Sequence, residues 1–255
     1  MAGMLKLSRR LATWLTFGML VAIPGLIFIG GGGVDPVALL AFPAAYDNVV
    51  GFVLTLGGLL ALVYGAAIAG SEWTWRTLKS AVARGESRSL YILATFAAVA
   101  AVYAIAIVLA VAFGVLAAVV GGAIAGISAD GIGDATALAT LPDKLARVWV
   151  AIVGVGALGF AIATLTRSQL AGIGVGVGVY VGGTFAANLL PDIVKYLPFS
   201  AADAVLAASR VRSPASEAAQ LPTLEPNIAL LVVVAWLVGA LIVAALFTER
   251  AEIAG

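Results

Sequence analysis

The chain has 255 residues, of which 63% are hydrophobic and 11% are charged, and its formal net charge is +1. Soluble domains carry about 45–50% apolar and about 25% charged residues, so this composition excludes an ordinary soluble enzyme. The chain has no cysteine and no histidine. Disulfides, thiolate nucleophiles, iron–sulfur clusters, Ser–His hydrolases and the usual zinc sites are therefore excluded, and the near-neutral charge does not indicate a nucleic-acid partner.

Six charge-free runs are long enough to cross a bilayer, which needs about 20 apolar residues per helix. In chain order they are Leu11–Val34, Asn48–Ser71, Ser89–Ala129, Val148–Thr166, Ser168–Pro191 and Asn227–Thr248. None of them alternates apolar and polar residues as the strands of a membrane barrel do. We therefore predict an all-α, polytopic membrane protein whose six transmembrane helices form one domain over residues 1–255.

The third run is too long for a single upright span, because at about 1.5 Å per residue it is nearly twice as long as the bilayer is thick. Its midpoint, Leu109–Phe113, contains no turn residue, whereas Gly121, Gly122 and Gly126 come later. We expect one helix from Ser89 to about Val120 and then a glycine-rich apolar loop. A hairpin here would give seven spans and would place more basic residues on one side, but the run lacks the residues to make the turn.

Basic residues are dense in two short segments, and short basic segments stay in the cytoplasm. Lys6, Arg9 and Arg10 precede the first span, and Arg76, Lys79, Arg84 and Arg88 separate the second from the third. With six spans, both termini are predicted to be cytoplasmic and the protein to lie in the cell membrane. Most acidic residues then lie outside.

The segment Ser71–Arg88 predicts a short cytoplasmic helix. Ser71 can cap the N-terminus of this helix. Glu72 suits its first turn and can pair with Arg76 one turn later. Gly85 can end the helix. A narrow apolar stripe consists of Trp75, Leu78 and Val82, and Arg76 and Lys79 flank it. Such a helix can lie on lipid, with Trp73 and Trp75 as anchors, or it can dock into a partner protein.

Three stretches resemble the bacterial permeases of type-2 ABC transporters. They are Glu72 followed by Arg76-Thr77-Leu78-Lys79 and Arg84–Arg88, the turn-like Leu158–Leu170, and Tyr196-Leu197-Pro198-Phe199 before the last span. The chain departs from the family pattern at Arg76, where glycine is usual, at Thr95, where a lysine is frequent, and in its short segment Met1–Arg10. The resemblance implies an exporter subunit on which separate ATPase subunits dock, at Glu72, Trp75, Arg76, Leu78, Lys79, Val82 and Arg167.

The same resemblance implies that this chain is not itself an enzyme. It contains no GxxxxGK[ST] phosphate loop, so ATP and Mg²⁺ would be bound by the partner ATPases, with no cofactor or metal in this chain. A second permease copy or a paralogue would complete the pathway. The fifth span has glycines four residues apart, which permit close packing within the chain or against another subunit. Because the family pairs through its first and fifth spans, we expect interface or pathway roles for Gly172, Gly176, Gly178, Gly182, Thr16 and Asn188.

The central parts of the spans carry no ionisable residue, which argues against proton-coupled transport and suits an amphipathic or lipid-like cargo. Ser200–Asp203 is a capping-box pattern and predicts a short extracytoplasmic helix that rests on the membrane or caps the bundle. One alternative function is a stand-alone structural or assembly membrane protein. Another, a lipid-acting membrane enzyme, lacks a cluster of carboxylates that would face a common site.

Overall fold

A computed structural model describes residues 10–30, 35–74, 83, 85, 87–206 and 223–250. Six of its helices are long and apolar enough to span a membrane, as predicted. They are α2 (Leu11–Gly30), α4 (Ala44–Thr74), α6 (Arg88–Ile124), α7 (Ala135–Thr166), α8 (Gln169–Leu189) and α12 (Pro226–Arg250). The described part of the chain contains no strand. The protein is therefore an all-α, multi-pass membrane protein.

Short elements lie between the long helices: α3 (Pro36–Leu40), the 3-10 turn η1 (Asp130–Gly133), α9 (Pro191–Val194) and α10 (Pro198–Ala204). The short helix α10 confirms the helix predicted near Ser200, but the capping box was wrong. Leu197 is the N-cap residue and no side chain caps the helix, so Ser200 lies inside it. Because Phe199, Ala202 and Val205 are buried and α10 packs against α12 and α7, this helix covers the bundle.

The third run is one helix, so the described ranges contain six long helices and not seven. It continues to Ile124, past the predicted end near Val120, because the helix tolerates Gly121 and Gly122. At Gly121 the missing side chain is required, since a Cβ there would overlap the backbone oxygen of Phe28 in α2. The helix ends where Gly126 takes φ +75° and the Ile127 amide donates to the Gly122 oxygen at 2.8 Å, as in a glycine-terminated helix end.

Two other helix boundaries also differ from the predictions. Helix α7 begins at Ala135, well before Val148, because Asp134 caps it by accepting from the Ala137 amide. Helix α4 continues to Thr74, so the prediction that a new helix starts at Ser71 was wrong. A charge-free run marks the part of a helix that can face lipid, whereas a helix itself can continue through charged residues that are paired or exposed.

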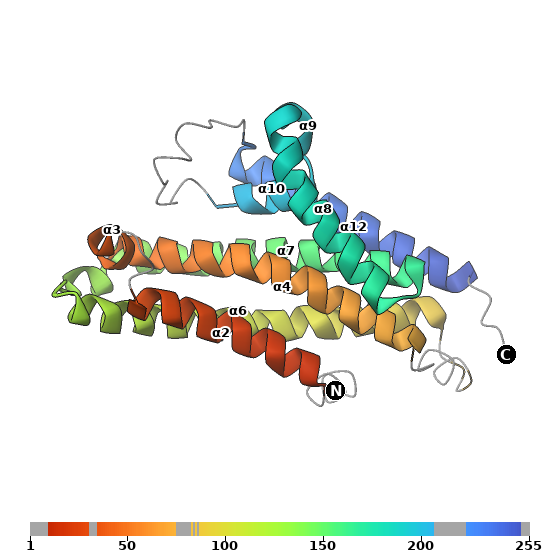
Figure 1. Cartoon of the computed structure of the whole chain (residues 1–255), viewed down its shortest axis with the longest axis horizontal. Coiled ribbons are helices and arrows are strands. Elements are labelled where there is room, and N and C mark those ends of the chain that lie inside the picture. Colours follow the sequence, from red (N-terminus) through yellow and green to blue (C-terminus); the bar gives the residue numbers. More distant parts are fainter. Residues whose placement is uncertain are drawn as a thin grey trace.

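Helices α4 and α7 form the centre of the bundle and share its most extensive contact. Glycines allow their backbones to approach, because a Cβ at Gly65 would overlap the Gly156 oxygen and one at Gly159 would overlap the Leu62 oxygen. Helix α2 packs on α6 and α4, α8 packs on α4 and α7, and α12 packs on α7 and α6. Figure 1 shows α2 and α8 on opposite sides of α4.

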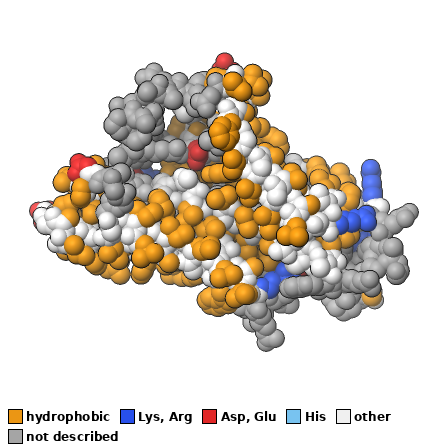
Figure 2. Space-filling model, viewed as in Figure 1, with side chains coloured by type: hydrophobic (Ala, Val, Ile, Leu, Met, Phe, Trp, Pro, Cys, Tyr) orange, Lys and Arg blue, Asp and Glu red, His pale blue; other side chains and the backbone are white. Residues whose placement is uncertain are grey.

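The two ends of the bundle carry different charges. One end, which we call the arginine end, holds Arg10, Arg88, Arg167 and Arg250 at the ends of α2, α6, α7 and α12. The opposite, aspartate end holds Asp35, Asp47, Asp130 and Asp134. Figure 2 shows apolar side chains spread over the face between them. The described start of α2 and end of α12 both lie at the arginine end (Figure 1).

Candidate functional site

A buried polar cluster ties three helices together at the arginine end. It consists of Arg10, just before α2, Ser71 and Glu72 in the last turns of α4, and Tyr91 in the first turn of α6. The Arg10 guanidinium donates to the Ser71 hydroxyl and to the Glu72 carboxylate, the latter at 2.9 Å. The Tyr91 hydroxyl donates to the other Glu72 oxygen at 2.6 Å. We call these four residues the Arg10–Glu72 cluster.

Glu72 is completely buried and Arg10 is 9% exposed. This corrects the prediction that Glu72 lies exposed at the rim of a docking helix. Its predicted partner Arg76 lies outside the described residues. A buried carboxylate needs a cationic and hydrogen-bonding partner to offset its lost hydration, and Arg10 with Tyr91 supplies both. Ser71 does not cap a helix either, because its hydroxyl donates back to the Ile68 oxygen at 2.7 Å.

Sequence reasoning missed Arg10, which was expected only to orient the first span by its charge, although its guanidinium is the cation that pairs with Glu72. The available signal was an arginine and a glutamate each placed next to the same membrane boundary, at the start of one span and the end of the next. When such an arginine and glutamate pair with each other, neither charge has to face the hydrocarbon of the bilayer alone. Nothing local in either segment indicates which cation the glutamate meets.

The docking residues predicted in the segment that follows α4 lie outside the described residues: Trp75, Arg76, Leu78, Lys79 and Val82. Both ends of this segment are nevertheless placed. It leaves α4 two residues after Glu72, and it reaches α6 at Ser87, whose hydroxyl accepts from the Leu90 amide. Next to this cap, the Ser89 amide donates to the Glu249 carboxylate at 3.2 Å, which joins the start of α6 to the end of α12.

Arg167, the other predicted docking residue, is exposed at the arginine end. It is the left-handed C-cap of α7, with φ 52°, a conformation uncommon for a residue other than glycine. Its guanidinium carbon lies 5.1 Å from the centroid of the Trp73 ring and 5.4 Å from that of Phe247. These cation–π contacts join the ends of α4, α7 and α12, and no local pattern in the sequence indicated them.

The glycines of α8 divide into two groups, which the sequence alone did not separate. Gly172 and Gly176 face the bundle, since a Cβ on Gly172 would lie 2.5 Å from the Ala163 Cβ and one on Gly176 would lie 3.0 Å from Leu62 Cδ2. Gly174, Gly178 and Gly182 are exposed, with no atom within 4 Å of an added Cβ. We call these three the α8 glycine ridge.

The chain matches the model of a family described as "Protein of unknown function (DUF2705)" over residues 14–254. The chain belongs to this family. No curated protein matches it. The match extends over almost all of the chain, from the first turn of α2 to beyond the end of α12, but carries no function with it.

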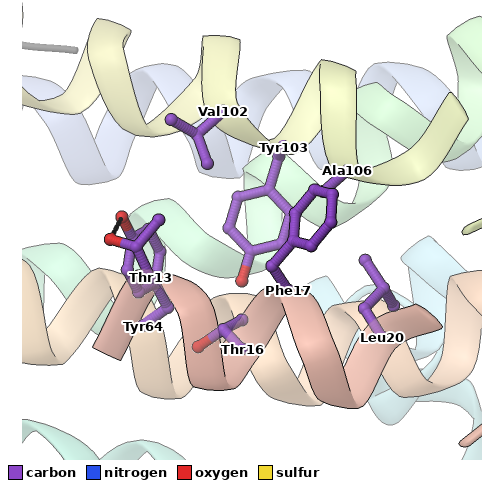
Figure 3. Close-up of a pocket in the computed structure, with 8 residues that line it drawn as sticks. All are labelled: Thr13, Thr16, Phe17, Leu20, Tyr64, Val102, Tyr103 and Ala106. Carbon is purple, nitrogen blue, oxygen red and sulfur yellow. Dashed lines mark hydrogen bonds between the residues drawn. The ribbon is translucent and has the colours of Figure 1, made fainter. Parts of the chain in front are cut away.

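The remaining predicted interface or pathway residues are Thr16 and Asn188. Thr16 lines a small cavity between α2, α4 and α6 (Figure 3). Asn188 belongs to α8, but its side chain is outside the described part of the structure. Within the described ranges, no three acidic side chains come together in a group that could hold a metal ion.

Proposed function

We propose that this protein is the membrane-spanning subunit of an ATP-driven exporter, on which separate ATPase subunits dock. The observation that supports this most is the place of the Arg10–Glu72 cluster. The cluster lies where α4 leaves the bundle toward residues 75–82, the predicted docking segment, and it joins α4 to α2 and α6. A force applied to that segment would therefore act on three helices at once.

The other end of the docking segment has a comparable connection. Helix α6 starts at Arg88, which donates to the Glu249 backbone oxygen at 3.4 Å, and the Glu249 carboxylate accepts from the Ser89 amide. Movement of the segment would therefore also act on α12. Arg167, held against Trp73 and Phe247, would offer the ATPase a second cationic contact at the same end. In this proposal the chain is not catalytic, and ATP and Mg²⁺ are bound by the partner ATPases.

The pathway would form between this chain and a second permease copy or a paralogue. The α8 glycine ridge supports this, because exposed glycines let another helix approach closely in lipid. The cargo would be amphipathic or lipid-like, since the described parts of the spans hold their charged side chains at the two ends of the bundle. The proposal includes the bilayer as a partner and no nucleic acid.

We propose a cell-membrane location with the arginine end, and hence both termini, in the cytoplasm. Single cysteines can be introduced because the chain contains none. Ser128→Cys, in the exposed connection between α6 and η1, should react with an impermeant maleimide applied to intact cells. Gln169→Cys, exposed at the start of α8, should react only after the cells are opened. Labelling of Gln169→Cys in intact cells would contradict this orientation.

The docking proposal is tested by the double variant Trp75→Ala/Leu78→Ala. Burial of an aromatic and an aliphatic side chain in a partner groove contributes about 1.5–3 kcal/mol for each side chain, so the loss of both should detach the ATPase or weaken its retention at least tenfold. Retention is measured by pull-down of the ATPase with the tagged permease from membranes. Cargo-stimulated ATP hydrolysis is measured in the same preparation.

Trp14→Ala/Leu15→Ala is the matched control, because it removes the same two residue types from an exposed face of α2, where they are 62% and 55% exposed. This control should keep the ATPase. Full retention and normal stimulated hydrolysis in Trp75→Ala/Leu78→Ala would mean that the segment is not the docking element. If no ATPase is recovered even with the unaltered chain, a stand-alone structural protein becomes the better explanation.

A further inference from the structure

Contacts through the centre of the bundle fix how far α2 and α12 are shifted along it relative to each other. The side chains of Leu20 in α2 and Ile152 in α7 both reach Gly57 of α4. A Cβ added there would lie 3.5 Å from Leu20 Cδ1 and 2.5 Å from Ile152 Cδ1. Two residues further along α7, a Cβ added to Gly154 would lie 2.6 Å from Val233 Cγ1 in α12. The level of Leu20 in the bundle therefore corresponds to about two residues before Val233.

Measured from this common level, α2 and α12 cover different lengths of the bundle. Helix α2 extends about 15 Å from Leu20 to Gly30, toward the aspartate end, and the chain extends about 15 Å back to Arg10. Helix α12 extends only about 8 Å to Pro226 but about 28 Å to Arg250, at the arginine end. Helix α12 is thus displaced toward the arginine end by about 10 Å, and Figure 1 shows a displacement in the same direction.

A bilayer perpendicular to the bundle fits only one of these two helices. If its hydrocarbon core, about 30 Å thick, matched α2, it would contain Arg147, which donates to Asn227 at 3.1 Å. The exposed Leu246 of α12 would then lie in water. If the core matched α12 instead, it would contain Arg10, and the exposed Ile29 of α2 would lie in water. Charged groups in hydrocarbon are costly, so neither placement is favourable.

We propose that the bilayer crosses the bundle obliquely, so that lipid chains cover Leu11–Gly30 of α2 and Asn227–Thr248 of α12 at the same time. Each stretch is about 30 Å long, and Arg10 and Arg147 then both lie at headgroup level. Helix α6 contacts both helices, so their axes are about 20 Å apart. A displacement of about 10 Å over this distance corresponds to a tilt of about 20–30°, which is within the range of membrane helices.

The exposed side chains of α6 support the same placement. This helix has 37 residues and is about 55 Å long, so only part of it can lie in hydrocarbon. Toward the arginine end its large exposed apolar side chains are Leu90 and Leu93. Most of them form a band about 29 Å long in its outer part: Ile105, Val108, Leu109, Phe113, Leu116, Val120 and Ile124. This band ends level with α2, because Gly121 packs on the Phe28 oxygen. The inference does not depend on the proposed transport function.

Four single cysteines test the proposal in this cysteine-free chain. Met19→Cys and Leu231→Cys lie at one level on α2 and α12, at positions that are 48% and 70% exposed, and Trp14→Cys and Val238→Cys form a second such pair, at 62% and 49%. Each variant is labelled with bimane in phosphatidylcholine vesicles whose bromines lie either near the headgroups or near the chain ends. We expect deep bromines to quench Met19→Cys and Val238→Cys more strongly, and shallow bromines to quench Trp14→Cys and Leu231→Cys more strongly. The ratio of the two signals is compared, so partial covering by another subunit does not change the result.

An upright bilayer predicts equal depth within each pair, so equal quenching ratios within either pair would overturn the proposal. A second measurement needs no label on the surface. Solid-state NMR of the nitrogen-15-labelled protein in aligned bilayers gives the angle between α7, which runs along the bundle (Figure 1), and the membrane normal. We expect about 20–30°, and an angle below about 10° would also overturn the oblique placement.

Discussion

Replacing Glu72 by alanine is expected to lower the free energy of unfolding by about 3–5 kcal/mol, the loss found when one partner of a buried ion pair is removed. The change would remove the carboxylate that lies 2.9 Å from the Arg10 guanidinium, a group that is 9% exposed. It would also leave the Tyr91 hydroxyl without the acceptor that lies at 2.6 Å. Denaturation in detergent or in nanodiscs, followed by tryptophan fluorescence, measures the effect.

Asp192→Ala is the matched control, because it also removes a carboxylate from an ion pair, with Lys195 at 3.0 Å, but there the aspartate is 82% exposed. An exposed pair contributes about 0–1 kcal/mol, so little should change. The double variant Arg10→Leu/Glu72→Leu should recover most of the stability, since apolar replacement of a whole buried pair is commonly neutral. A loss below about 1 kcal/mol for Glu72→Ala would contradict the buried pair.

The double variant also separates stability from coupling. If the Arg10–Glu72 cluster transmits movement, Arg10→Leu/Glu72→Leu should fold and keep its ATPase, yet show reduced cargo-stimulated hydrolysis. The tie from α4 to α6 through Tyr91 would be lost along with the ion pair. Normal stimulated hydrolysis in a stable double variant would mean that the cluster holds the helices together but plays no part in coupling.

The second large effect is expected from Gly176→Leu and Gly178→Leu, which make the same change two residues apart in α8. At Gly176 the new side chain would collide with Leu62, whose Cδ2 would lie 3.0 Å from the added Cβ. Overpacking of this kind costs about 1–3 kcal/mol, so Gly176→Leu should destabilise the single chain. At Gly178 nothing within the chain lies within 4 Å, and leucine favours a helix over glycine by about 0.5–1 kcal/mol.

Gly178→Leu should therefore keep or increase the stability of the single chain while weakening its association with a second copy. Cross-linking in vesicles measures the dimer fraction, and thermal unfolding measures the chain. Gly239→Leu is the control, because Gly239 is an exposed glycine of α12 that also has nothing within 4 Å. If the dimer fraction of Gly178→Leu equals that of Gly239→Leu, the α8 glycine ridge faces lipid and not a second copy.

Much of the fold could be predicted from the sequence. Each of the six charge-free runs corresponds to one long helix, and the absence of a turn in Leu109–Phe113 correctly predicted a single α6. The boundaries were less accurate, most of all at α7, which extends outward from Val148 to Ala135. A run without charges shows which residues can lie in the hydrocarbon of the bilayer. A helix end depends instead on caps and pairs such as Asp134 with the Ala137 amide.

The candidate site was less predictable. Arg167 is exposed at the expected end, but its contacts with Trp73 and Phe247 come from three different helix ends. Glu72 was expected on an exposed rim, and it is buried against Arg10, which lies 62 residues away in the chain. The residues predicted to dock a partner between 75 and 82 lie outside the described ranges, so their role stays a prediction.

The sequence by itself determined the number of spans and the charge difference between the two ends, because both follow from the length and the charges of each segment against a bilayer of fixed thickness. The tertiary structure decided which face of each helix is inside. Each span is apolar on all of its faces, so its sequence pattern does not indicate which face is buried. Only the packing of α8 against α4 and α7 separates Gly172 and Gly176 from Gly178, and only the approach of α2 to α4 brings Arg10 to Glu72. Such contacts depend on the rotation and tilt of whole helices, which close packing across the bundle sets.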